Sequence, residues 1–357
     1  MAEIVIDHVT KTFGSFTAVD DIAMTFADGE VTCLLGPSGC GKTTLMRMLA
    51  GLETPTRGRV IFGGKDVTRL PPRKRNVGMV FQYPVMYPTL SVFENLELPM
   101  RYDRSVSKDE RRRRVDEILD VLDIRHLARA YIEELDAGTR QKVAVGRAVV
   151  RQSEIVLFDE PTTNVEVNAK LQLIRAFKTV TSRLKQTIVY VTHDQTEAMT
   201  LADRIALMKS GRIVQYDRPQ VLYGQPTTEF GGWFLGNPGM NFVPATVVNG
   251  QISAPILARP LNAPADLRGD KITVGIRPEL VRMTGAPGED SVPAKLVDQA
   301  IGIAGRYLTK ARIGDTVVKV NTQGRPPARL GETIHLSVPR ERLMLFQDGA
   351  RIPAQFG

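Results

Sequence analysis

The sequence is poor in the residues that build disulfide frameworks and zinc sites. It has only two cysteines, Cys33 and Cys40, and four histidines scattered along 357 residues. Two cysteines are too few for the disulfide network of a secreted domain, and neither has partners at the spacing of metal ligands. The sequence therefore predicts reduced cysteines and argues against a zinc site.

Long apolar runs are also missing. No stretch approaches the roughly 18 consecutive apolar residues of a membrane-spanning helix. The first ten residues, MAEIVIDHVT, lack the positive region and apolar run of a secretory signal. We therefore expect the chain to stay on the cytoplasmic side. Hydrophobic residues make up 43% of the sequence and charged residues 24%, as in ordinary folded proteins.

The charge balance is positive, with 47 Lys and Arg residues against 39 Asp and Glu residues and a net charge of +8. Such an excess can indicate nucleic acid, an anionic membrane face or phosphate ligands. The excess is spread over both halves of the chain, and only residues 101–114 are densely basic. We interpret 101–114 as a solvated helix face. Because no stripe of aromatic and basic residues is visible, we expect no nucleic-acid partner.

A change in the pattern of apolar residues along the chain predicts two domains. Residues 1–235 alternate buried-strand patterns with helical segments, including a mainly helical stretch at about 84–150. This pattern predicts an α/β domain with a parallel sheet. Over 240–357, short β-prone runs separated by Pro and Gly predict a small β-barrel. The segment GNPGMN at 236–241 is the candidate linker.

A glycine-rich loop is the strongest functional signal. Residues 36–43 read GPSGCGKT, the GxxxxGK[ST] pattern of a phosphate-binding loop, between the apolar run VTCLL and a predicted helix. Backbone N–H groups of such a loop and of the helix N-terminus surround phosphate oxygens. Lys42 would reach the β- and γ-phosphates and Thr43 a Mg²⁺ ion. The predicted nucleotide-binding residues are Gly36, Pro37, Ser38, Gly39, Cys40, Gly41, Lys42, Thr43 and Thr44.

Two adjacent carboxylates, Asp159 and Glu160, follow the apolar run IVLF. A buried parallel strand would deliver them to the carboxyl edge of the sheet, where ligands bind. Together with the phosphate loop, they predict a nucleotide site in which Asp159 is a Mg²⁺ ligand. Glu160 would be the general base that activates water for attack on the γ-phosphate.

Three further residues are candidates on less specific signals. His193 ends a second apolar strand, TIVYVTH, where an imidazole can hydrogen-bond the γ-phosphate or the attacking water. Gln82 follows VGMVF and could contact Mg²⁺ or water. Phe13 could stack on adenine, and a half-buried aromatic in a hairpin is an equally good interpretation of that residue.

Taken in this order, these segments resemble the ATPase subunit of ATP-binding cassette (ABC) transporters. GPSGCGKTT is similar to the Walker A motif, VFQ to the Q-loop, IVLFDEP to Walker B and VTHDQ to the switch-histidine segment. GLETPTRG, NPGMNF and VGIRPEL resemble the maltose-type importers of sugars and polyols. The resemblance implies a P-loop NTPase cassette with a helical subdomain, followed by an OB-like regulatory barrel of the TOBE type.

The resemblance also implies cofactors and partners. In this family two ATPase subunits pair head to tail beneath two membrane permease subunits, and a periplasmic binding protein delivers the solute. Each ATP lies between the Walker A of one subunit and the signature loop of the other. This implies ATP and Mg²⁺ as cofactors, a peripheral place on the cytoplasmic face of the bacterial inner membrane, and ATP hydrolysis coupled to import. It implies Phe13 at the adenine, Gln82 as a Mg²⁺ ligand and sensor facing the permeases, and Glu160 with His193 as the catalytic residues.

The signature loop departs from the family's LSGGQ, since it consists of Leu135, Asp136, Ala137, Gly138 and Thr139. The family's serine donates a hydrogen bond to the γ-phosphate held by the opposite subunit, whereas Asp136 would present a carboxylate to that anion. Like unit charges about 4 Å apart cost roughly 4 kcal/mol at an effective dielectric near 20. Protonation, displacement or weak binding should follow. The D-loop, TNVE at 163–166, also departs from the family's SNLD.

These departures leave two arrangements open. We favour a pair with a non-identical ATPase subunit, in which the loop at 135–139 faces a degenerate site; the alternative is a homodimer with slower sites. A regulatory nucleotide-binding subunit with little turnover, and a soluble cassette ATPase acting on nucleic acid or ribosomes, are further classes. The resemblance points to a sugar, glycerol or related polyol, or a glycerol phosphate as the solute.

Overall fold

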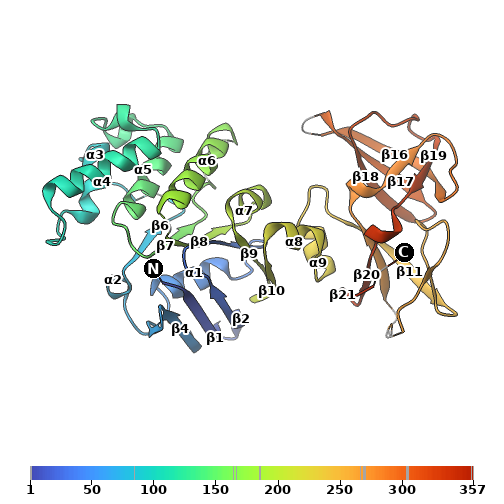
Figure 1. Ribbon diagram of the computed structural model, residues 1–357, viewed down its shortest axis with the longest axis horizontal. Coiled ribbons are helices and arrows are strands. Elements are labelled where there is room, and N and C mark those ends of the chain that lie inside the picture. Colours follow the sequence, from blue (N-terminus) through green and yellow to red (C-terminus); the bar gives the residue numbers. More distant parts are fainter. Residues whose placement is uncertain are drawn as a thin grey trace. The chain divides into compact units, whose positions relative to one another are not determined.

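The chain folds into two compact units, Met1–Pro219 and Gln220–Gly357, drawn from blue to red along the sequence in Figure 1. The computed structural model describes residues 2–83, 85–163, 165, 167–184, 186–265, 267, 271–302, 305–354 and 356. The ATPase-domain boundary near 235–240 stays a prediction. Among the described residues, no helix combines the length and apolar character needed to cross a membrane.

The first unit is organised around a six-stranded sheet. Its strands lie in the order β10, β9, β3, β8, β7, β6, and all but the antiparallel edge strand β10 are parallel. Strands β3, β7 and β8 are buried at every residue, which explains their continuous apolar runs. The six strands are β3 (Val31–Leu35), β6 (Val77–Val80), β7 (Ile155–Asp159), β8 (Thr187–Thr192), β9 (Arg204–Lys209) and β10 (Arg212–Asp217).

A second, antiparallel sheet has the order β2, β1, β4, β5. It consists of β1 (Ile4–Phe13), β2 (Phe16–Phe26), β4 (Arg57–Phe62) and β5 (Lys65–Asp66). Helix α1 (Lys42–Ala50) shares one hydrophobic core with both sheets through Leu45, Met46 and Leu49. This core holds the start of α1 at the carboxyl end of β3.

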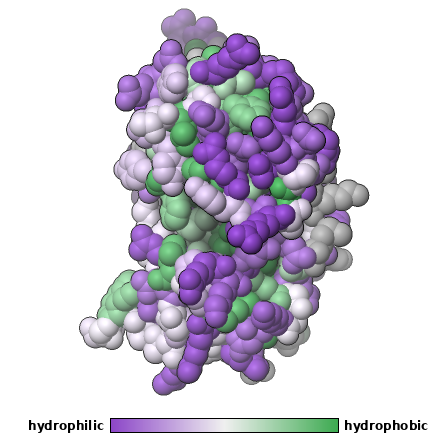
Figure 2. Space-filling view, turned by 90° about the vertical axis from the view of Figure 1, so that its left-hand side faces the viewer, coloured by the Kyte–Doolittle hydropathy of each residue, from purple (hydrophilic) through white to green (hydrophobic). Residues whose placement is uncertain are grey.

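The helical part follows β6. It contains α3 (Val92–Glu97), η1 (Leu98–Met100), α4 (Lys108–Val121), η2 (Arg125–Leu127), η3 (Ile132–Glu134) and α5 (Ala137–Val149). Three helices lie outside this part. Helix α2 (Pro72–Arg75) precedes β6, and β8 lies between α6 (Val167–Leu184) and α7 (Gln195–Leu201) in the sequence. Val115, Ile118 and Leu119 bury one face of α4, as their spacing predicts. Its arginines form ion pairs with carboxylates on α3 and on α4 itself. Figure 2, which views the molecule from the left-hand side of Figure 1, shows hydrophilic side chains over much of that surface.

The second unit contains two antiparallel sheets around one hydrophobic core. Their strand orders are β13, β12, β11, β14, β20, β21 and β15, β19, β16, β17, β18. Its strands are β11 (Asn241–Val248), β12 (Gln251–Ser253), β13 (Leu261–Asn262), β14 (Ile272–Ile276), β15 (Arg282–Thr284), β16 (Ser291–Ile301), β17 (Tyr307–Ile313), β18 (Thr316–Thr322), β19 (Thr333–Ser337), β20 (Met344–Gln347) and β21 (Ala350–Ile352). Its helices are α8 (Pro219–Gly224, starting at the unit boundary), α9 (Glu229–Phe234), η4 (Pro278–Leu280) and η6 (Arg340–Arg342). The small β-barrel domain expected after the cassette is thus found as two antiparallel sheets around one core.

Candidate functional site

The phosphate loop joins β3 to α1, with residues 36–41 in the loop and Lys42, Thr43 and Thr44 opening the helix. A Cβ on Gly36 would lie 2.4 Å from the carbonyl oxygen of Met208. Gly41 has a φ of 105°, and its Cβ would lie 2.3 Å from the carbonyl oxygen of Ala18. Close backbone approach therefore requires glycine at both positions.

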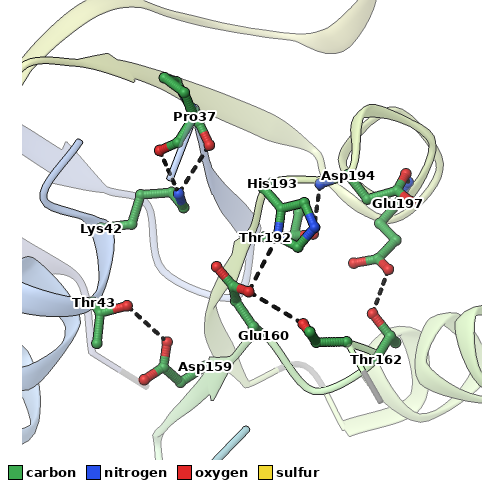
Figure 3. A network of polar contacts seen from close by, with 12 residues as sticks. Pro37, Lys42, Thr43, Asp159, Glu160, Thr162, Thr192, His193, Asp194 and Glu197 are labelled. Carbon is green, nitrogen blue, oxygen red and sulfur yellow. Dashed lines mark hydrogen bonds and ion pairs between the residues drawn. The ribbon is translucent and has the colours of Figure 1, made fainter. Parts of the chain in front are cut away.

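The start of α1 has the chemistry of an anion site. Gly41 provides no side-chain cap, and the first turn of α1 contains no acidic residue. The first N–H groups of a helix have no intrahelical acceptor, and the helix dipole adds positive potential there. Lys42 is 4% exposed, and its ammonium donates hydrogen bonds to the carbonyl oxygens of Gly36 (2.8 Å) and Pro37 (3.0 Å). Figure 3 shows Lys42 beside Pro37. The loop thus wraps around a buried positive charge.

Thr43 and Asp159 are in contact although they lie 116 residues apart in the sequence. The Thr43 hydroxyl donates to Oδ1 of Asp159 at 3.4 Å. Burial, reinforced by the neighbouring charge of Glu160, raises the pKa of Asp159 above its ordinary value. A bound cation would relieve this unfavourable charge. A hydroxyl and a carboxylate are oxygen donors of the kind Mg²⁺ takes, with water and phosphate oxygens completing its shell. In the described parts of the chain no group of three His, Cys, Asp or Glu residues forms a fuller metal cluster.

Glu160 and His193 come together at the ends of β7 and β8. The Glu160 Oε2 atom lies 3.1 Å from Nδ1 of His193 and accepts a hydrogen bond from the Thr163 hydroxyl at 3.1 Å. Glu160 has a φ of 46°, and its N–H donates to the carbonyl oxygen of Val191 at 3.0 Å. A non-glycine residue in this region costs on the order of 1–3 kcal/mol, which the surrounding contacts must offset. The backbone thereby turns the carboxylate out of the strand toward His193.

The two remaining nucleotide candidates lie in peripheral segments. Phe13 ends β1 opposite Phe16, is 46% exposed, and has the Lys11 ammonium 4.8 Å from its ring centre. The structure thus places Phe13 half-exposed in a hairpin beside Lys11, and adenine stacking stays a prediction. Gln82 is partly buried in the loop after β6. A groove of about 330 Å³ opens beside this loop, lined among others by Phe81 and Arg147.

The altered signature loop starts α5. Asp136 is the N-cap of this helix, and its Oδ1 accepts the N–H of Thr139 at 2.7 Å while the Thr139 hydroxyl donates to Oδ2 at 3.1 Å. The hydrogen bond from the Thr139 N–H lowers the pKa of Asp136, against a smaller opposing effect of burial. Protonation is therefore the least accessible of the three expected responses to a nearby phosphate. Of the altered D-loop, Asn164 and Glu166 lie outside the described residues.

Sequence reasoning missed a buried charged group behind the site. Glu197 on α7 is fully buried and receives hydrogen bonds from Thr162 and Tyr190. Glu197 lies on the buried face of α7 together with Ala198 and Leu201. An acidic residue on an apolar helix face was therefore the available signal of a buried, paired carboxylate.

Comparisons with known proteins agree with this geometry. The family described as "ABC transporter" matches residues 19–163, and the "MalK OB fold domain" matches residues 236–281. The sn-glycerol-3-phosphate import ATP-binding protein UgpC of Ruegeria pomeroyi is 38% identical, with 99% of each chain covered. The diacetylchitobiose uptake ATP-binding protein MsiK of Streptomyces coelicolor is 36% identical over 95% of this chain and 96% of its own.

A solved structure agrees as well. The dimeric bacterial ABC transporter cassette MJ0796 is 29% identical and covers 60% of this chain and 98% of its own, with a TM-score of 0.54. The near-complete coverage by UgpC and MsiK extends the similarity beyond the cassette to the β-rich unit. The chain therefore belongs to the ABC transporter family, as an ATPase subunit of the sugar-importer type.

Proposed function

We propose that this chain hydrolyses ATP to energise the import of a sugar, a polyol such as glycerol, or a glycerol phosphate. The relatives support this solute class, since they are named for sn-glycerol-3-phosphate, lactose and diacetylchitobiose. The observation that carries the catalytic part is the convergence of the phosphate loop, Asp159, Glu160 and His193 at one edge of the sheet.

The proposed roles follow from the positions of these groups. The N–H groups at the start of α1 and the Lys42 ammonium bind the phosphates. Thr43 and Asp159 would hold Mg²⁺, with Gln82 as a further ligand, and the ion would supply positive charge beside the phosphates. The Glu160 carboxylate orients the attacking water and accepts its proton. The contact between His193 Nδ1 and Glu160 Oε2 orients the imidazole.

The proposed partners are two permease subunits, a periplasmic substrate-binding protein and a second ATPase subunit, assembled at the cytoplasmic face of the inner membrane. The groove beside Gln82 is the proposed permease contact, because it combines exposed Phe81 and Val85 with the guanidinium groups of Arg147 and Arg151. An apolar groove with cationic groups suits a helix that carries apolar and acidic side chains.

We further propose that the second ATPase subunit is a non-identical paralogue. The support is Asp136, whose ionised carboxylate stands where the family's signature serine would meet the partner's ATP. The partner's ordinary signature would complete the site of Lys42, Glu160 and His193, while 135–139 would face a degenerate site. A homodimer is the second candidate, favoured by the relatives' family and by the dimeric cassette MJ0796.

Purification of the chain alone, and together with a candidate paralogue and permeases, tests both proposals. We expect slow ATP turnover by the chain alone and fast turnover by the mixed complex. Robust cooperative turnover by the lone chain would contradict the unlike pair. Lack of ATP binding and of turnover in every combination would contradict the proposed function, and a ligand screen of the binding protein would identify the solute.

A further inference from the structure

A buried charged network lies behind the candidate catalytic pair. The Glu197 carboxylate on α7 has no exposed surface and contacts three other elements. Thr162, in the loop after β7, donates its hydroxyl to Oε1 of Glu197, and Tyr190 of β8 donates its hydroxyl to Oε2 at 3.0 Å. Lys170 of α6 places its ammonium 2.7 Å from Oε1. A single carboxylate thus joins four segments of the chain, and Figure 3 shows its contact with Thr162.

The network pairs one ammonium group with two carboxylates and adds hydrogen bonds to both carboxylates. The Lys170 ammonium also lies 2.6 Å from Oδ2 of Asp194, the residue after His193. Burial acts to lower the pKa of Lys170, but the hydrogen bonds to Asp194 and Glu197 outweigh it and leave this pKa raised. Asp194 also caps α7 by accepting the N–H groups of Thr196 (2.7 Å) and Glu197 (3.2 Å). An unpaired carboxylate at this depth would be strongly unfavourable, so the partners of Glu197 hold it in one place.

The network spans the same two chain segments as the catalytic pair. Thr162 lies two residues after Glu160, and Asp194 directly follows His193. On the exposed side of these loops, Glu160 and His193 are 3.1 Å apart; on the buried side, Glu197 joins Thr162 to the start of α7. We propose that Glu197 and Thr162 are positioning residues that hold Glu160 and His193 in register for ATP hydrolysis. This inference rests on the proposed roles of Glu160 and His193.

Paired substitutions at Thr162 test the link. Thr162→Val removes the hydroxyl that reaches Glu197 and changes little else in shape. We expect kcat to fall about 10- to 100-fold, because misplacing a catalytic group by about 1 Å costs that much. The KM for ATP should stay within about twofold, since the hydrogen bonds and ion pairs of this network among the described residues do not involve the phosphate loop. Thr162→Ser keeps a hydroxyl and should restore kcat.

Thr187→Val is the matched control. Thr187 is also a fully buried threonine beside the central sheet, but it lies at the start of β8, and its hydroxyl donates to the carbonyl oxygen of Ala2 at 2.9 Å. Both valine variants should lower the thermal midpoint, and only Thr162→Val should lower kcat selectively. Equal losses of kcat in the two variants would mean that Thr162 only stabilises the fold, and would overturn the inference.

Hydrogen exchange provides a readout that does not need turnover. The Glu160 N–H is held by the carbonyl oxygen of Val191, so loosening the loop should speed exchange in peptides covering 158–163. We expect faster exchange there in Thr162→Val and not in Thr162→Ser or Thr187→Val. Unchanged exchange in Thr162→Val refutes the positioning role, whereas an unmodified chain without turnover in any assembly refutes the proposed function.

Discussion

The charge of Asp136 can be removed while its helix cap is kept. In Asp136→Asn the amide oxygen can still accept the N–H of Thr139, and Asn is as good an N-cap as Asp. The start of α5 should therefore persist, with a change in the free energy of unfolding below about 1 kcal/mol. The variant isolates one quantity, the repulsion between this carboxylate and a phosphate on the opposite subunit.

The size of that repulsion follows from the surroundings of Asp136. One pair of unit charges about 4 Å apart contributes roughly 4 kcal/mol at an effective dielectric near 20. Asp136 is exposed in the single chain, so water and salt reduce this figure to about 1–2 kcal/mol. We therefore expect ATP to bind the site facing Asp136 about 5- to 30-fold more tightly in Asp136→Asn, the ratio that corresponds to that energy.

The contribution of the Asp136 cap to the free energy of unfolding depends on pH with a definite sign. Because the Thr139 N–H lowers the pKa of Asp136 in the folded chain, its capping contribution to stability is full above the ordinary pKa of an aspartate. It is lost only as the pH falls through the lowered value. The carboxylate thus stays charged at neutral and mildly acidic pH, and the difference in ATP affinity between the unmodified chain and Asp136→Asn should not change there.

Equilibrium binding of a fluorescent ATP analogue to the assembled ATPase pair measures this effect, at low and high salt. Asp136→Glu, which keeps the charge at a poorer cap, is the control and should show no gain. High salt should shrink the gain of Asp136→Asn. If Asp136→Asn binds ATP no more tightly than the unmodified chain, or if Asp136→Glu gains equally, the electrostatic reasoning is wrong.

Three other substitutions test the site and the core. Glu160→Gln should lower phosphate release at least about 100-fold while ATP binding persists, since it removes the proposed base and leaves the phosphate loop intact; retained turnover would contradict that role. Gly36→Ala should abolish measurable ATP binding, because its Cβ would lie 2.4 Å from a backbone oxygen of Met208, whereas Gly224→Ala, with open space around it, is the harmless control. Leu157→Ala, in fully buried β7, should lower the free energy of unfolding by about 2–5 kcal/mol in a urea titration, and a loss below about 1 kcal/mol would contradict the assigned core.

Several elements were predictable because their signals are local. The apolar runs that became β7 and β8 indicated strands buried on both faces, and the parallel sheet confirmed them. The buried residues of α4, Val115, Ile118 and Leu119, recur at helical spacing, which is a local signal of the same kind. A period of two or 3.6 residues, or a continuous apolar run, reports burial without knowledge of the partner surface.

Other features depended on residues far apart in sequence. The 3.1 Å contact between Glu160 and His193 and the raised pKa of Asp159 arise only when β7 and β8 lie side by side and desolvate the carboxyl edge. The apolar face of α7 was the one local signal for the burial of Glu197, and it did not identify the hydrogen-bonding partners, which come from three other elements. The desolvation of these charged groups depends on which distant segments pack against them, so hydrophobic periodicity does not report it.

The amino-acid sequence by itself determined that the chain carries a phosphate loop, a strand-end carboxylate pair and a β-rich second domain. Glycine placement and apolar periodicity act through bonds and neighbours along the chain, so they are legible without a structure. Only the tertiary structure decided that Glu197 is fully buried and that it connects the two catalytic loops. Those outcomes depend on hydrogen-bond geometry and burial, which exist only once distant segments have come together.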